Sequence, residues 1–335
     1  MRYKHFKNAN VDVSALSVGT WATGSFGYGD VKDDESVQAI RAMVDGGVNL
    51  IDTAPVYGDG HSELVVGEAI KTMDRDKIFL STKFGVGITH ARYKRAEIRG
   101  EQIPEEGLRD ATYANVLYEC EQSLRRLGTD YLDFYFVHWP DYDTPFAETM
   151  EALNTLKKEG KIRFIGLSNF DKDQILECEQ TAQIDVIQPP YSMVVRRDEE
   201  LMKWCVERGI DTFTYGSLGA GILTGTFREP PTFHPGDPRN GFYPFFVEPH
   251  FSKVMKVLDV MDEISAEIGK SLPQIAINWA TQRDFVSTAL CGVRTVAEAQ
   301  DNCSTFDWQL DDAQMARLNE AVETYIDFDG SAPLK

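Results

Sequence analysis

Short apolar segments rich in β-branched and aromatic residues alternate with helical patterns along the chain, and this alternation restricts the available folds more than any other feature. Eight such segments are expected to be strands: 15–20, 48–52, 77–83, 131–138, 162–168, 185–188, 211–215 and 286–290. Between them, apolar side chains recur every three or four residues, as at Val116, Cys120 and Leu124, which indicates helices. A strand followed by a helix, eight times over, predicts an α/β fold of the (β/α)8 TIM barrel type. An open doubly wound sheet is disfavoured, because residues 17–30 do not match the G-x-G-x-x-G turn cleanly.

The length of 335 residues suits one such barrel, and no linker, low-complexity tract or internal repeat divides the sequence. We therefore expect a single domain over residues 1–335, with its active-site loops at the carboxyl ends of the strands. Three stretches interrupt the alternation: 85–111, 224–250 and 325–335. The first holds a basic run at 90–99, which we interpret as a solvated loop face, with an anionic-substrate site as the alternative.

The composition limits the classes of binding partner that the protein can have. The chain has 53 acidic and 34 basic residues and a net charge of -19, which repels nucleic acid and anionic membrane surfaces. We expect neither as a partner, and the oligomeric state stays open. No signal-like segment and no run of about 18 apolar residues occurs, so we expect a cytoplasmic protein. Dispersed cysteines without a CxxC pair are interpreted as reduced core thiols, with no metal site: Cys120, Cys178, Cys205, Cys291 and Cys303.

Polar residues stand at the carboxyl ends of the expected strands, where parallel strands buried on both faces should end apolar. They are Asp52, Lys83, His138, Ser168, Asn169, Gln188 and Tyr215. In a (β/α)8 barrel these positions meet at the face that carries the active site. The sequence therefore predicts a polar site at that face.

Four residues form a proton-donating group in this prediction. Lys83 ends a very apolar strand, so it needs a partner, and Asp52 is the natural one. Tyr57 follows Asp52 in a turn, and its phenol, with a free pKa of about 10, is a weak acid unless a nearby cation stabilises the phenolate. His138 would add an imidazole to the same space. Taken singly, three of these residues are better explained as turn, loop or core residues: Asp52, Tyr57 and His138. For Lys83 alone, a structural and a functional role explain the position equally well.

The chain resembles the aldo-keto reductase superfamily over nearly its whole length, in particular its bacterial, channel β-subunit-like and sugar or aldehyde reductase branches. The motifs that carry the resemblance are "VNLIDTAPVYGDGHSELVVGEAI", "IFLSTKFG", "SLRRLGTDYLDFYFVHWPD", "GKIRFIGLSNF", "IQPPYSM", "YGSLGAGILTG" and "CGVRTVAEAQDN". They stand in the family's order and at its spacing. The family tetrad falls without substitution on Asp52, Tyr57, Lys83 and His138.

This resemblance implies an NADP-dependent oxidoreductase that transfers hydride between NADPH and an aldehyde or ketone, sugars included. Tyr57 would protonate the carbonyl oxygen as general acid, and would act as base in the oxidative direction. Lys83, held by Asp52, would lower the pKa of Tyr57. His138 would orient and polarise the carbonyl.

A nicotinamide cofactor site is implied as well. By analogy its residues are Thr20, Trp21, Ser168, Asn169, Gln188, Tyr215, Ser217, Leu218, Gly219, Gly221, Gly292, Arg294, Glu298 and Asn302. Three polar residues among them would hold the nicotinamide carboxamide: Ser168, Asn169 and Gln188. Tyr215 would stack on the nicotinamide ring. Small residues at 217–221 would approach the pyrophosphate. Structural capping of loops is the alternative for the carboxamide group.

The adenosine end decides between NADP(H) and NAD(H). Arg294 falls on the family position that contacts the 2'-phosphate, and Asn302 matches the adenine-contacting asparagine. A guanidinium there favours NADP(H), although Arg294 could instead pair with a surface carboxylate. Two departures weaken that preference, since Glu298 replaces a common glutamine and Thr226 replaces a frequent lysine. NAD(H) therefore stays an alternative cofactor.

The substrate is left open by the sequence, as is the direction of the reaction. Trp21 and Trp139 are the implied substrate contacts, and the loops 21–33, 85–111 and 224–250 would shape the pocket; their aromatic residues either line it or pack the loops. Two other functions are retained: an NAD(P)-dependent dehydrogenase of a sugar or polyol, and a catalytically slow, nucleotide-bound regulatory subunit. The intact tetrad and the expected absence of an extra N-terminal segment argue against the second.

Overall fold

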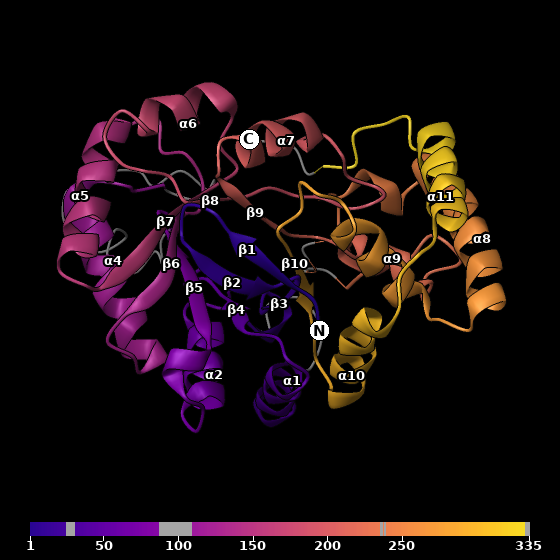
Figure 1. Cartoon of the computed structure of the whole chain (residues 1–335), viewed down its shortest axis with the longest axis horizontal. Helices are drawn as coiled ribbons and strands as arrows, with labels where there is room; N and C mark the ends of the chain where they lie inside the picture. Colours follow the sequence, from indigo (N-terminus) through magenta and orange to yellow (C-terminus); the bar gives the residue numbers. More distant parts are fainter. Residues whose placement is uncertain (25–30, 87–108, 235–236, 238, 332–335) are drawn as a thin grey trace.

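The computed structural model describes residues 1–24, 31–86, 109–234, 237 and 239–331, and in this part of the chain eight parallel strands close into a barrel (Figure 1). Their order follows the sequence, and the last strand pairs with the first. The strands are β3 (Leu16–Gly19), β4 (Leu50–Asp52), β5 (Phe79–Phe84), β6 (Leu132–Val137), β7 (Ile162–Ser168), β8 (Val186–Gln188), β9 (Asp211–Thr214) and β10 (Thr288–Gly292). The (β/α)8 barrel expected from the sequence is confirmed, and each strand lies within two residues of its expected bounds.

Helices surround the barrel (Figure 1). The α-helices are α1 (Asp33–Asp45), α2 (His61–Ile70), α4 (Tyr113–Leu127), α5 (Phe146–Lys158), α6 (Lys172–Cys178), α7 (Glu199–Glu207), α8 (His250–Ile268), α9 (Leu272–Thr281), α10 (Val296–Ser304) and α11 (Asp312–Tyr325). Short 3-10 helices are η1 (Ala22–Gly24), η2 (Arg75–Lys77), η3 (Gly219–Thr224), η4 (Pro244–Phe246) and η5 (Thr305–Asp307). Helices α8 and α11 pack against each other beside the barrel (Figure 1).

Alternate side chains of strand β6 belong to two different hydrophobic cores. Phe134 and Phe136 belong to the cluster inside the barrel, while Tyr135 and Val137 belong to the larger core between strands and helices. Successive side chains of a strand point to opposite faces, and in a closed barrel both faces are buried. This explains why β6 reads as one continuous apolar run.

A hairpin of β1 (Tyr3–Phe6) and β2 (Val11–Ser14) closes the amino-terminal end of the barrel, and it lies in front of the barrel strands in Figure 1. Phe6 contacts Phe213 and Phe134, with ring centroids 5.5 and 6.2 Å apart. Sequence analysis did not predict this hairpin, because its two short strands lie in a mostly polar segment. Because the hairpin covers this end of the barrel, the active site is expected at the opposite end, where the carboxyl ends of the strands lie.

Three further expectations concern the cysteines, membrane-spanning segments and the basic run 90–99. All five cysteines are free thiols, and four of them are buried. Among the described residues no helix is both long and apolar enough to cross a membrane. The basic run 90–99 and most of the loop 85–111 lie outside the described residues.

Candidate active site

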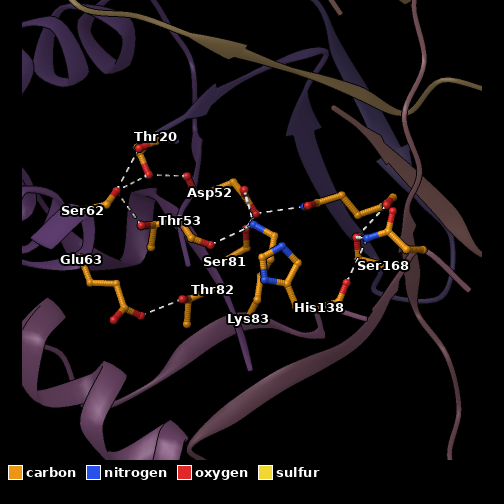
Figure 2. Close-up of polar contacts among 12 residues, drawn as sticks. Thr20, Asp52, Thr53, Ser62, Glu63, Ser81, Thr82, Lys83, His138 and Ser168 are labelled. Carbon is orange, nitrogen blue, oxygen red and sulfur yellow. Dashed lines mark hydrogen bonds and ion pairs between the residues drawn. The ribbon is translucent and has the colours of Figure 1, made fainter. Parts of the chain in front are cut away.

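Lys83 and Asp52 form a buried ion pair at the carboxyl ends of the neighbouring strands β5 and β4 (Figure 2). Lys83 Nζ lies 2.6 Å from Asp52 Oδ2 and donates a second hydrogen bond to the backbone carbonyl of Thr53 at 2.9 Å. Asp52 Oδ1 accepts from Ser81 Oγ at 2.5 Å and from Gln188 Nε2 at 3.0 Å. The side chains of the pair are 0% and 3% exposed. Buried charges persist when paired and hydrogen-bonded in this way.

Tyr57 stands beside this pair, in the turn between β4 and α2. A Cβ on Gly58, which has φ +66°, would collide with the carbonyl oxygen of Gly24. The two glycines therefore let the Tyr57 turn rest backbone to backbone on η1. Lys83 Nζ lies 5.1 Å from the centroid of the Tyr57 ring, and the His138 ring lies 6.0 Å away at 84°. The four residues of the expected tetrad thus meet at one end of the barrel.

A second hydrogen-bonded group joins His138 to strands β7, β8 and β9. Asn169, with φ +63°, donates through Nδ2 to the backbone carbonyl of His138 and to Ser168 Oγ, both at 3.0 Å. Tyr215 donates its hydroxyl proton to Asn169 Oδ1 at 3.0 Å, and Ser168 Oγ donates to the Gln188 carbonyl at 2.9 Å. The polar residues expected around the carboxamide therefore lie together, and they also bond one another.

The electrostatics of the site follow from burial. Burial lowers the pKa of His138 well below its usual value, and the charge of Lys83 lowers it further, so the imidazole is neutral near pH 7. Burial also lowers the pKa of Lys83, and Asp52 opposes this by charge and by hydrogen bonding. A neutral imidazole at this position can donate a hydrogen bond without adding a second positive charge beside the ammonium.

The pKa of the Tyr57 phenol differs from the value expected from the sequence. Burial raises its pKa well above 10, and the negative charge of Asp52 raises it further. The net pKa of Tyr57 is therefore raised in this structure and not lowered as expected, because burial and the charge of Asp52 both favour the neutral phenol; a lowering effect of Lys83 itself stays a prediction. Tyr57 is held in its protonated form throughout the neutral range.

The turn after β9 contains the residues expected at the pyrophosphate. Gly219, Ala220 and Gly221 have consecutive positive φ values of 57°, 51° and 98°, and Leu218 precedes them at the start of η3. Ser217 Oγ is buried and has no hydrogen-bond partner in the described part of the chain. Leaving a buried hydroxyl unpaired costs about 1–3 kcal/mol, so such an atom points to a ligand.

At the expected adenosine end, Arg294 pairs with Glu298. Arg294 Nη2 lies 2.9 Å from Glu298 Oε1, and the arginine is 56% exposed. Gly292 ends β10 beside β3, and Asn302 is buried on α10. Thr20 follows Gly19, the partner of Gly292 on β3, and donates to the backbone carbonyl of Asp52 at 2.9 Å. Arg294 thus has the surface carboxylate partner that the sequence left as an alternative.

Aromatic rings border the tetrad. The Trp21 ring centroid lies 6.3 Å from that of Tyr57 and 6.4 Å from that of Phe242, which makes an apolar wall beside the phenol. Trp139 lies under the guanidinium of Arg109, 5.3 Å from the ring centroid. Other aromatics of the segment 224–250 are buried and pack that segment: Tyr243, Phe245 and Phe246.

Comparison with known proteins assigns this site to a family. The model of the family described as "Aldo/keto reductase family" matches residues 15–323. The chain belongs to the aldo/keto reductase family. It is therefore an oxidoreductase by family, as the sequence motifs indicated.

Aldo/keto reductases of diverse description are similar to this chain. The aldo-keto reductase YhdN of Bacillus subtilis is 35% identical over 97% of this chain and 95% of its own. An NADH-specific methylglyoxal reductase of Escherichia coli is 32% identical over 94% and 96%. Among solved structures, the glycerol dehydrogenase of Gluconobacter oxydans has a TM-score of 0.82 at 31% identity, covering 100% of this chain and 97% of that one. An aldo/keto reductase of Klebsiella pneumoniae in complex with NADP and acetate has a TM-score of 0.73 at 26% identity, covering 99% of both chains.

Sequence reasoning missed several polar residues of this aldo/keto reductase site. Ser81 bonds Asp52, while Ser62 and Glu63 at the start of α2 bond strand ends (Figure 2). One signal was available for Ser81, because the period of two puts it on the same face of β5 as Lys83. No local signal marked the partners of Ser62 and Glu63, since they come from other strands.

Proposed function

We propose that this aldo/keto reductase reduces the carbonyl group of an aldehyde or ketone, sugar carbonyls included, with hydride from a nicotinamide cofactor and a proton from Tyr57. The observation that carries this proposal is the exposure of the tetrad. Lys83 and Asp52 are buried, whereas Tyr57 and His138 keep partial exposure. The two groups that must touch a substrate are thus the two that a substrate can reach.

The residues of the chain fit a nicotinamide cofactor. Ser217 offers a buried hydroxyl without a partner in the described structure, beside the turn with three positive φ values. Asn169 and Gln188 place amide groups near the tetrad, and Tyr215 lies against Asn169. When bound, the cofactor supplies the hydride that the protein itself cannot supply.

The protein contributes orientation and a proton. His138 donates a hydrogen bond to the carbonyl oxygen, which polarises the C=O bond and turns its carbon toward the hydride donor. As the carbon gains the hydride, the oxygen takes the hydroxyl proton of Tyr57, and an alcohol is formed. The phenolate left on Tyr57 is stabilised by the Lys83 ammonium until water returns the proton. Trp21 and Phe242 shield this exchange from bulk water on one side.

We propose NADP(H) as the preferred cofactor, with NAD(H) accepted. Arg294 supports the first choice, because a guanidinium matches a phosphate dianion. Glu298 limits that preference, since it occupies the guanidinium and adds a negative charge. The relatives include both an NADH-specific enzyme and a complex with NADP.

Oxidation of a polyol is the second candidate, supported by the likeness to a glycerol dehydrogenase. The protonated state of Tyr57 favours reduction, because oxidation needs this group as a base. A slow regulatory role is a third alternative, since relatives at 30% identity include a probable voltage-gated potassium channel subunit beta of Arabidopsis thaliana. The intact tetrad, with Tyr57 and His138 partly exposed, supports turnover instead.

A panel assay tests the proposal. Oxidation of NADPH and of NADH is followed with small aldehydes, ketones and aldoses, and reduction of NADP and NAD is followed with glycerol and other polyols. We expect turnover with carbonyl substrates to exceed turnover with polyols at pH 7. Bound cofactor with no turnover on either panel would instead support a regulatory subunit.

A further inference from the structure

The first turn of α2 carries two buried polar residues that the proposed reaction does not use. Ser62 and Glu63 follow Tyr57 by a few residues, and both are 0% exposed. A carboxylate is almost never fully buried unless it is paired. The question is why the chain keeps one here, directly behind the site.

Ser62 ties α2 to the ends of the neighbouring strands β3 and β4, the second of which carries Asp52 (Figure 2). Its hydroxyl oxygen lies 2.7 Å from Thr20 Oγ1 and 3.0 Å from Thr53 Oγ1. Thr20 in turn donates to the Asp52 backbone carbonyl at 2.9 Å. The Ser62 backbone N–H donates to the Tyr57 carbonyl at 3.2 Å. The start of α2 is therefore bonded to the Tyr57 turn and to the strand that carries Asp52.

Glu63 ties the same turn of helix to β5, the strand that carries Lys83. Its Oε1 accepts from Thr82 Oγ1 at 2.7 Å, and its Oε2 lies 2.6 Å from Arg126 Nε on α4. Thr82 precedes Lys83 and points to the opposite face of the strand. Because the two residues are adjacent in one strand, a shift of Thr82 would shift Lys83 as well.

The charge of Glu63 also reaches Lys83. Burial lowers the pKa of Lys83, Asp52 opposes that effect most strongly, and Glu63 adds to the opposition. The titratable and charged groups that act on Glu63 or feel its charge are Lys83, Glu119, Cys120, Arg126 and Tyr135.

We propose that Glu63 is a positioning residue for carbonyl reduction. Held between Thr82 and Arg126, it fixes the place of Lys83 relative to Tyr57 and supplies a second negative charge to that ammonium. This inference rests on the function proposed above. It gives α2 a role beyond covering the barrel, because one helical turn holds the three segments that carry Asp52, Tyr57 and Lys83 in register.

Two substitutions separate position from charge. Glu63→Gln keeps an oxygen for Thr82 but removes the charge that raises the pKa of Lys83. We therefore expect kcat to fall about tenfold and the basic limb of the pH–rate profile to move about one unit toward lower pH. Thr82→Val keeps the charge but removes the hydrogen bond, so kcat should fall while the limb stays in place. Thr82→Ser should restore kcat. In all three variants KM and the cofactor Kd should stay within about twofold of wild type.

Asp133→Asn is the matched control. Asp133 is also fully buried, is paired with Arg75 and Arg163 at 2.8 Å, and accepts from the Leu80 N–H of β5 at 2.9 Å, but it lies at the amino-terminal end of the barrel. Its loss should lower the unfolding midpoint without moving the pH–rate profile. If Glu63→Gln lowers kcat only in step with stability, as Asp133→Asn does, the positioning role is wrong. If wild type itself reduces no carbonyl, the proposed function fails instead.

Discussion

Glu298 binds Arg294 twice. Its Oε1 accepts from the guanidinium at 2.9 Å, and its Oε2 accepts from the backbone N–H of the same arginine at 2.8 Å. Both contacts fall within one turn, because Glu298 lies in the first turn of α10 and Thr295 caps that helix. The guanidinium has five N–H donors, one of which faces Glu298, so a phosphate bound there would share the arginine with a carboxylate that repels it. Under the proposed function, the cofactor preference of this chain is therefore a competition between the Glu298 carboxylate and the 2'-phosphate for Arg294.

Replacing Glu298 by glutamine should shift the preference toward NADPH. The change removes the competing charge and keeps the size of the side chain, so Arg294 becomes available to the 2'-phosphate. We expect the Kd for NADPH to fall about fivefold, or about 1 kcal/mol for an exposed pair, and the Kd for NADH to stay nearly constant. Fluorescence titration with both nucleotides measures this. An equal gain for NADH would contradict the competition.

Replacing Arg294 by alanine should have the opposite effect. The loss of the guanidinium should weaken NADPH binding by about tenfold and NADH binding much less, because the 2'-phosphate is present in NADPH alone. Arg228→Ala serves as the control, since Arg228 also forms an exposed ion pair, with Asp262. Equal losses for both nucleotides would remove the phosphate contact from the account.

Tyr57→Phe should remove carbonyl reduction and spare cofactor binding. The phenylalanine keeps the ring between Trp21 and His138 but has no proton to give. General acid catalysis contributes about 10²- to 10⁴-fold, so kcat should fall by this range while the cofactor Kd stays within about twofold. Tyr118→Phe, on the exposed surface of α4, is the control. Reduction at the wild-type rate in Tyr57→Phe would show that another group donates the proton.

The sequence revealed the barrel and the tetrad for the same physical reason. Asp52 and Lys83 are charges at the ends of apolar runs, and parallel strands bring such ends together, so periodicity alone placed them at one face. The structure puts them 2.6 Å apart. Tyr57 was predicted from its place in the turn after Asp52, which no periodicity describes, and the resemblance gave it the role of general acid.

Other features depend on contacts between distant segments and left no local pattern. Glu63 reads as an ordinary first-turn acid of α2, and its bonds to Thr82 and Arg126 exist only once the barrel has closed. The direction of the Tyr57 pKa shift could not be predicted from the sequence either, because it depends on burial and on the distance of the Asp52 charge. The β1–β2 hairpin was missed because short strands in a polar segment carry little periodicity.

His138 should make the protein less stable in mild acid. Its pKa in the folded state is well below the unfolded value of about 6.5, so below that pH the unfolded chain binds a proton that the folded chain does not. The free energy of unfolding should therefore fall as the pH drops below about 6.5. Urea unfolding at pH 5.5 and 7.5 should show a smaller difference for His138→Asn than for wild type. His5→Asn, at an exposed histidine on β1, should keep the wild-type difference.

Glu119 should have the opposite pH dependence. This carboxyl lies on α4, where burial raises its pKa from 4.5 to about 7, although Asn115 and the Gly85 N–H donate to it. Between those values the folded chain holds a proton that the unfolded chain has lost, so stability should fall as the pH rises from about 4.5 to 7.

The glutamine variant isolates this contribution. Glu119→Gln cannot ionise, so it should lose less stability than wild type between pH 5 and 8, by an amount on the order of 3 kcal/mol. Urea unfolding at the two pH values measures the difference, and Glu121→Gln on the same helix, at a partly exposed side chain that pairs with Lys161, should behave like wild type. A parallel pH dependence in Glu119→Gln and wild type would mean that this carboxyl ionises in the folded chain as easily as in water. A charged Glu119 carboxylate would then be tolerated beside the Gly85 N–H at the end of β5, although the burial of this side chain argues against it.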